Sequence, residues 1–156
     1  MTILALEFSS PQRSVAVVCG SPGGTASVVS EVVETGGSGT RAFGMIESAL
    51  QEARLEREQI ELLAIGLGPG SYTGIRIALA IAQGWQLSLP GDHLKLVGLS
   101  SVECLAAQAQ AEKVRGRVNV VVDAQRNEFY LATYEISESG YQETEPLQIR
   151  MRAEVE

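Results

Sequence analysis

The sequence predicts an α/β fold with a first lobe of strands and helices and the opening of a second lobe. Between Ile3 and Val33, three short segments rich in Val, Ile and Leu are separated by turn residues, which is typical of an antiparallel meander. From Thr40 onward, helical periodicity alternates with short apolar strands, as in a sheet covered by helices. We therefore predict the order β-β-β-α-β-α within residues 1–98, followed by α-β-β within residues 99–156 as a partial second lobe.

The opening meander is predicted from its apolar runs and from the breaks between them. Pro and Gly interrupt regular structure most strongly, and they occur in a Ser-Ser-Pro stretch and in the run Gly20–Gly24. The three strands are therefore expected at Ile3–Phe8, Ser14–Cys19 and Ala26–Val33.

A first helix is predicted at Thr40–Arg54, with Ser38 or Thr40 as its N-cap. Its apolar residues recur at intervals of three and four, which predicts packing against the sheet. This stripe consists of Phe43, Ile46, Leu50 and Ala53. The next apolar run, Leu62–Gly66, has no polar alternation, as expected for a strand that is covered on both faces.

The segment Thr73–Leu89 is apolar on nearly all sides, which predicts a helix with the sheet on one side and a further partner on the other. Its small residues Ala78, Ala82 and Gly84 would let a neighbouring helix approach closely. A central core helix is the main interpretation, and a partner-binding surface is the alternative.

The remaining elements are predicted from breaks, caps and alternation. A break at Pro90–His93 precedes a short strand at Leu94–Val97. Ser100 or Ser101 is expected to cap a helix that runs to about Ala111, where Glu103 suits the positive end of the helix dipole. A hairpin is expected from Arg117–Asp123 and Glu128–Ile136, and the acidic segment Ser137–Glu156 has too little patterning for an assignment.

Composition limits the kinds of function. The 156 residues are 45% hydrophobic, which is enough for a core. The formal charge of -7 opposes direct nucleic-acid binding, which needs clustered Lys and Arg. Cys19 and Cys104 form no C-x-x-C pair, so we expect two buried, reduced thiols. No apolar run is long enough to span a membrane, and we expect a cytoplasmic protein.

The most specific motif is the glycine-rich run Gly66–Arg76, which reads GLGPGSYTGIR and joins an apolar strand to an apolar helix. Such a turn can hold an anion, or it can simply cap a packed helix. It is neither a Walker A loop nor a dinucleotide fingerprint. The single histidine, His93, excludes a paired-histidine metallopeptidase, and the absence of a G-x-S-x-G elbow opposes a serine hydrolase.

Together with Ile3–Ser10 and Val122–Tyr130, this motif resembles the bacterial TsaB family, also called YeaZ, over about Met1–Tyr134. The resemblance implies an actin-like, ribonuclease H-like fold related to Hsp70. It also implies a non-catalytic role in making threonylcarbamoyl-adenosine, the modified base beside the anticodon of many tRNAs. Because members of the family usually continue with more helix and strand, we expect this chain to be a truncated piece, a proteolytic product or a shortened member of the family.

The resemblance also implies a possible phosphate site at the strand ends. Its candidate residues are Glu7, Ser9, Ser71, Thr73 and Asp123. Glu7 stands where the family usually carries Asp, and the extra methylene changes any metal geometry. The alternative is that Glu7 accepts hydrogen bonds from loop N–H groups while Ser9 or Ser10 caps the turn. We expect no catalytic residue and no metal ligand here, and ATP or ADP with Mg²⁺ only at the level of a complex.

The partner implied by the resemblance is a TsaD-type catalytic subunit, with a TsaE-type ATPase as a further candidate. The helices Thr40–Arg54 and Thr73–Leu89 would form the interface, which would also permit homodimers of the isolated chain. The candidate contacts are Ile75, Arg76, Leu79, Ala82 and Gln86. Contact with tRNA would be indirect, and no membrane is involved. Two alternatives are a small nucleotide-binding ATPase or kinase-like enzyme and a plain homodimeric fragment.

Overall fold

The computed structural model describes residues 1–21, 24–36, 39–88 and 94–155. The chain divides into two compact units: Met1–Leu67 with Ser71–Leu99 form unit 1, and Gly68–Gly70 with Ser100–Glu156 form unit 2. The expected features at Pro22, Gly23, Ser38 and Pro90–His93 lie outside the described residues, so the interpretation of His93 stays a prediction. Each unit is described by itself.

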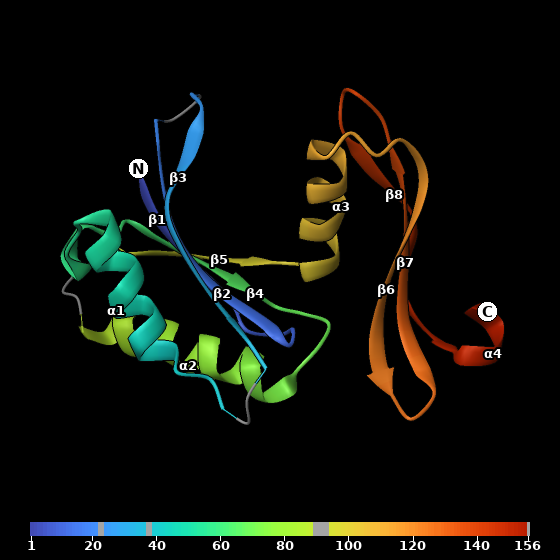
Figure 1. The fold of residues 1–156 in the computed structure, drawn as a ribbon, viewed down its shortest axis with the longest axis horizontal. Coiled ribbons are helices and arrows are strands. Elements are labelled where there is room, and N and C mark those ends of the chain that lie inside the picture. Colours follow the sequence, from blue (N-terminus) through green and yellow to red (C-terminus); the bar gives the residue numbers. More distant parts are fainter. Residues whose placement is uncertain (22–23, 37–38, 89–93, 156) are drawn as a thin grey trace. The chain divides into compact units, whose positions relative to one another are not determined.

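Unit 1 is built on a five-stranded sheet with the order β3-β2-β1-β4-β5 (Figure 1). The first three strands pair antiparallel, whereas β4 pairs parallel with β1 and β5 pairs parallel with β4. The strands are β1 (Thr2–Glu7), β2 (Gln12–Gly20), β3 (Ala26–Thr35), β4 (Leu62–Gly66) and β5 (Lys95–Leu99). The sheet is therefore mixed, with a parallel part whose strands need crossover connections.

Two helices supply those crossovers and cover one face of the sheet. Helix α1 (Ala42–Ala53) packs on β2 and β3, and α2 (Tyr72–Ser88) packs on β1 and β4 (Figure 1). A short turn, η1 (Arg57–Gln59), follows α1. The buried side chains of both helices join one core with alternate residues of β1, β2 and β4, such as Leu4, Val15 and Leu63. Burying each such side chain stabilises the fold by roughly 1.5–3 kcal/mol.

The expected core stripe of α1 is wrong at one end. Phe43 was expected to pack on the sheet, but its side chain is 76% exposed. The residues that face the core are Ala42, Met45, Ile46, Ala49 and Leu50. The apolar stripe of the sequence can begin at either Ala42 or Phe43, and contact with the sheet selects the smaller Ala42. Phe43 is thereby left on the outer side of the helix.

The start of α1 also differs from expectation. Its N-cap is Arg41, with no side-chain hydrogen bond to the first turn, rather than Thr40. The Thr40 hydroxyl instead accepts a hydrogen bond of 3.0 Å from Arg13, which is 8% exposed. The same guanidinium donates to the carbonyls of Gly36 at 2.5 Å and Gly39 at 2.6 Å. Arg13 therefore holds the segment that leads into α1.

Helix α2 has one buried and one open side. Its buried residues are Gly74, Ala78, Ile81, Ala82 and Trp85, in keeping with the core interpretation for that side. On the other side, Leu79 and Leu87 are exposed, although the sequence is apolar there as well. The nearly uniform hydrophobicity of α2 thus combines a side that packs in the core with a side that is open to solvent.

Unit 2 is an antiparallel sheet with the order β6-β7-β8 and one helix against it. Its core contains Val102 and Ala106 of the helix and Val120, Ala132, Tyr134 and Ile136 of the sheet. The elements are α3 (Ser101–Ala111), β6 (Gly116–Gln125), β7 (Glu128–Ile136), β8 (Tyr141–Met151) and α4 (Arg152–Val155). The chain thus combines a sheet that has parallel pairs with a second, wholly antiparallel sheet.

The structure assigns one segment that the sequence left open and corrects the expectation about the two cysteines. The segment without an assignment contains β8, an exposed edge strand whose register with β7 shifts near Thr133, so an alternating pattern is lost. The expectation of two buried thiols is wrong, because Cys104 is exposed and Cys19 is half-buried. Helix α3 faces its core through Val102 and Ala106, and Cys104 lies between these two positions on an exposed side of the helix. None of the described helices is long and apolar enough to cross a membrane.

Candidate functional site

The glycine-rich turn begins where β4 ends, and two of its glycines let other parts of the chain approach the backbone closely. A Cβ at Gly66 would overlap the carboxylate of Glu7 at the end of β1. A Cβ at Gly74, in the first turn of α2, would overlap the carbonyl oxygen of Phe8. Only glycine can occupy such positions without displacing the neighbouring backbone or carboxylate. The motif therefore brings β4 and α2 against the end of β1.

Three of the candidate phosphate-site residues lie together and bind one another. A Glu7 carboxylate oxygen accepts a hydrogen bond of 2.6 Å from the N–H of Ser9. The N–H of Ser71 donates to the carbonyl of Ser9 at 2.6 Å, and the Ser71 hydroxyl accepts the N–H of Gly74 at 3.2 Å. Ser71 thus caps α2, and Glu7 binds a loop N–H as the alternative interpretation expects.

The other two candidates lie elsewhere. Thr73 is exposed on α2 beside Arg76 and Leu79, on a shallow surface. Asp123 belongs to unit 2, where its carboxylate accepts the N–H of Gln125 at 2.7 Å within the β6–β7 hairpin. Over the described ranges, no group of three or more His, Cys, Asp or Glu side chains could hold a metal ion.

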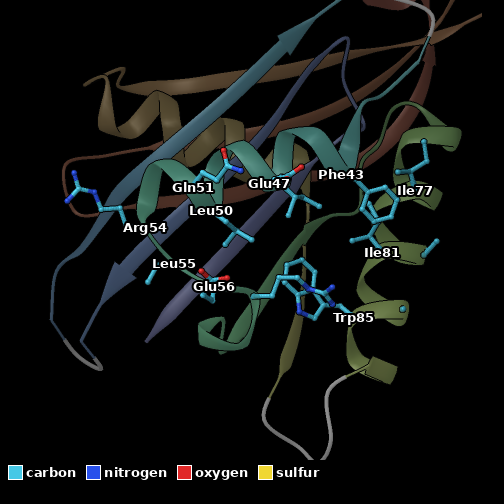
Figure 2. A pocket seen from close by; sticks show the side chains of 14 residues that line it. Phe43, Glu47, Leu50, Gln51, Arg54, Leu55, Glu56, Ile77, Ile81 and Trp85 are labelled. Atoms are coloured by element: carbon cyan, nitrogen blue, oxygen red, sulfur yellow. The ribbon is translucent and has the colours of Figure 1, made fainter.

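A groove of about 1070 Å³ lies between α1 and α2 in unit 1. In Figure 2, the ring of Phe43 reaches from α1 toward Ile77 and Ile81 on α2, while Trp85 lies further along, toward the turn that carries Glu56. The apolar lining residues are Phe43, Ile46, Leu50, Leu55, Ile77, Ala80, Ile81 and Trp85. The charged lining residues are Glu47, Arg54, Glu56 and Arg57. The groove is thus an apolar channel with a charged rim.

Large apolar side chains on the two helices are open to solvent: Phe43 lines the groove, and Tyr72 and Leu87 lie on α2. Phe43 is 76% exposed, Tyr72 is 73% exposed and Leu87 is 88% exposed. Where such side chains form a contiguous apolar patch, that patch marks an interaction site more often than ordinary protein surface does. We call the exposed side chains of α1 and α2 together with the groove the α1/α2 face.

The predicted interface residues do not all reach this face. Arg76, Leu79 and Gln86 are exposed, and Ile75 is half-buried. Ala82, however, is only 1% exposed and belongs to the core of unit 1, so it is removed from the candidate contacts. The guanidinium of Arg76 lies 5.3 Å from the centre of the Tyr72 ring, which orients it along the helix surface.

Trp85 and Arg57 meet at one part of the groove, and sequence reasoning did not single them out. The Arg57 guanidinium lies 4.9 Å from the centre of the Trp85 ring and donates to the Ser88 hydroxyl at 3.2 Å. Trp85 is 5% exposed, and its indole N–H has no hydrogen-bond acceptor among the described residues. Since these residues are far apart along the chain, no local pattern could have paired them.

Comparison with known proteins identifies related chains. Residues 39–146 match the family model described as "TsaD: tRNA N6-adenosine threonylcarbamoyltransferase". The chain is 33% identical to tRNA threonylcarbamoyladenosine biosynthesis protein TsaB of Escherichia coli, over 74% of this chain and 48% of that protein. It is 27% identical to the Bacillus subtilis protein of the same name, over 99% of this chain and 64% of that protein. The chain spans about half to two thirds of these relatives.

A solved structure agrees with these sequence relatives. YeaZ from Pseudomonas aeruginosa superposes with a TM-score of 0.77 at 27% identity, over 95% of this chain and 66% of that one. The family model covers more than half of the chain, and the relatives that extend across most of it share one name. Together, these matches show that the chain belongs to the TsaB (YeaZ) family.

Proposed function

We propose that this chain supports the biosynthesis of threonylcarbamoyladenosine in tRNA as a non-catalytic subunit. The support is its family membership and the name that its relatives carry. Unit 1 would be an actin-like lobe, and unit 2 the start of another. The sheet order β3-β2-β1-β4-β5 with α1 and α2 on one face supports that assignment.

The partner in this proposal is a TsaD-type catalytic subunit bound through the α1/α2 face. The observation that carries it is the groove between α1 and α2, which the exposed ring of Phe43 lines, together with the exposed ring of Tyr72 at the start of α2. A monomer gains nothing from exposing these side chains, whereas an interface buries them at its centre. The same face would let the isolated chain form homodimers. A TsaE-type ATPase would join through the catalytic subunit.

An accessory role fits the chemistry of the glycine-rich turn. Glu7, Ser9 and Ser71 are engaged with backbone groups of their own loop, which leaves little of a phosphate cradle. The net charge of -7 likewise opposes direct contact with tRNA. We therefore propose that ATP or ADP with Mg²⁺ binds at the level of the complex and not at these three residues alone.

The test is light scattering of the purified chain alone and mixed with a TsaD-type protein from the same source. Leu79→Glu puts a charge on the α1/α2 face, at a side chain that is 38% exposed, and should abolish the heterodimer while the chain stays folded. Leu105→Glu is the matched control, because Leu105 is a helical leucine that is 44% exposed in unit 2. The control should associate like the wild type.

Either result is informative. Association lost in a folded Leu79→Glu variant and kept in Leu105→Glu supports the partner and its surface. If the wild type does not associate, or if Leu79→Glu associates as tightly as the wild type, the proposal that α1 and α2 bind the catalytic subunit is wrong.

A further inference from the structure

Arg57 is the charged group best placed to receive a partner inside the groove. Its guanidinium lies over the Trp85 ring at 4.9 Å and donates a hydrogen bond to the uncharged Ser88 hydroxyl. None of the ion pairs found in the described ranges uses Arg57. Among the described residues the neighbouring Glu56 forms no ion pair with Arg57, and its carboxylate takes part in a capping box with Gln59. The positive charge of Arg57 can therefore pair with an acidic group of a partner, while the Trp85 ring supports the guanidinium.

A second observation at the same place indicates a missing acceptor. The indole nitrogen of Trp85 is buried and has no acceptor among the residues that the structure describes. Buried N–H groups are nearly always hydrogen-bonded, and an unpaired one lowers stability. Arg57 thus presents a cation at one part of the groove, and the Trp85 ring, 4.9 Å from that cation, carries an unused donor that is enclosed below the surface. A group with two acceptor oxygens and a negative charge would complement both.

We propose that a carboxylate side chain of the partner subunit enters this part of the groove, pairs with Arg57 and gives the indole N–H of Trp85 an acceptor. The proposal rests on the proposed function, because the partner seated on the α1/α2 face supplies the carboxylate. A carboxylate offers two acceptor oxygens to a guanidinium in one plane, which makes such pairs strong and directional. Because the indole nitrogen is enclosed in the isolated chain, its surroundings must shift as the carboxylate arrives.

The rest of the groove favours an acidic side chain on an apolar segment over a phosphate backbone. Ile46, Leu50 and Ile81 line the groove and offer apolar contacts only. Its charged rim carries two glutamates and two arginines, so it has no excess of positive charge. Nucleic acid needs clustered cations, whereas one acid beside apolar residues needs a single arginine. The occupant is therefore a protein segment with apolar side chains and one Asp or Glu.

The experiment compares Arg57→Gln with Arg54→Gln in binding to the TsaD-type subunit from the same source. Both arginines line the groove, but only Arg57 lies over Trp85. Calorimetry should show a dissociation constant about tenfold higher for Arg57→Gln, as expected for the loss of a charge-assisted pair, and within about twofold of wild type for Arg54→Gln. Replacing the partner's Asp and Glu residues one at a time should identify one whose effect disappears in the Arg57→Gln background.

Trp85 provides an independent signal, because it is the only tryptophan of the chain. The partner is first made free of tryptophan by replacement with phenylalanine, so that Trp85 is the fluorophore. At saturation, the Trp85 fluorescence of the wild-type chain should change on binding this partner, and that of Arg57→Gln should change less. Trp85→Phe keeps an aromatic ring beside Arg57 but removes the indole N–H, and it should also weaken binding. If Arg57→Gln does not fold, Arg57→Lys retains the charge without the planar fork and should bind with intermediate affinity.

The outcomes separate this inference from the proposed function. Wild-type affinity for Arg57→Gln and Arg57→Lys, with binding still abolished by Leu79→Glu, would overturn the carboxylate site and leave the interface standing. The inference also fails if no partner carboxylate couples to Arg57. Wild-type binding by Leu79→Glu as well would instead remove the interface itself.

Discussion

Gly74 lies against Phe8 so closely that a Cβ at position 74 would overlap the Phe8 carbonyl oxygen. Helix α2 therefore meets the end of β1 without any side chain between them. This contact places the first turn of α2, capped by Ser71, directly beside the residues that follow β1. It also sets the position of α2 on the sheet, and hence one wall of the α1/α2 groove.

Gly74→Ala should destabilise unit 1 by about 1–3 kcal/mol or more, because the added methyl group meets backbone rather than a movable side chain. Gly84→Ala is the matched control in the same helix. A Cβ at Gly84 meets nothing within 4 Å, and the change should stabilise α2 by up to about 1 kcal/mol. Urea unfolding of both variants measures the difference. Equal stabilities would contradict the close contact.

Truncation of the two phenylalanines Phe8 and Phe43 should change the free energy of unfolding by very different amounts. Phe8 is 1% exposed, and Phe8→Ala should cost about 3–5 kcal/mol through lost burial and a residual cavity. Phe43 is 76% exposed, and Phe43→Ala should change stability by less than about 0.5 kcal/mol. Thermal unfolding tests stability, and light scattering with the TsaD-type subunit tests association. A large loss of stability in Phe43→Ala would place its ring in the core instead of on the α1/α2 face.

Arg13→Met should loosen the start of α1. The change removes donors to the Gly36 and Gly39 carbonyls and to the Thr40 hydroxyl, and the free energy of unfolding should fall by about 2–3 kcal/mol. Arg115→Met is the control, since the exposed Arg115 also donates to two carbonyls, those of Gln110 and Val114. Its loss should cost less than about 1 kcal/mol. Chemical denaturation distinguishes the two, and similar losses would argue against a special role for burial.

Glu34 should titrate below the usual range of a glutamate. The side-chain hydrogen bond from Arg41 is the largest cause that lowers the pKa of Glu34. Because its folded pKa lies below its unfolded pKa, its stabilising contribution is present above the unfolded value of about 4.3 and is lost as pH falls through the folded value. NMR titration of the Glu34 carboxyl group should show its pKa rise in Arg41→Gln. An unchanged pKa would mean that Arg41 does not hold it.

ATP with Mg²⁺ should show no binding to the isolated chain by calorimetry at millimolar nucleotide. The reason is that Glu7 and Ser71 already bind N–H groups of their own loop. Tight binding that disappears in Glu7→Ala and in Asp123→Ala would support the alternative of a small nucleotide-binding enzyme.

Local patterns in the sequence were sufficient for the type and place of most elements. The bounds expected for Leu62–Gly66 and Glu128–Ile136 agree with β4 and β7, since uninterrupted or alternating apolar residues report strand burial within a few positions. The glycine-rich motif likewise indicated a strand–turn–helix junction. The edge strand β8 was not predicted, because a strand that buries little of either face has no strong hydrophobic pattern.

What the sequence determined by itself was therefore the succession of strands, turns and helices and, through three motifs, the family. Only the tertiary structure decided which apolar residues are covered: Phe43 lies open, Ala82 is buried, and Trp85 lies beneath Arg57. Periodicity reports which residues share a side of a helix, but in a helix as apolar as α2 it does not report which side meets the sheet. That choice depends on contacts between residues distant in the chain, such as Gly74 with Phe8.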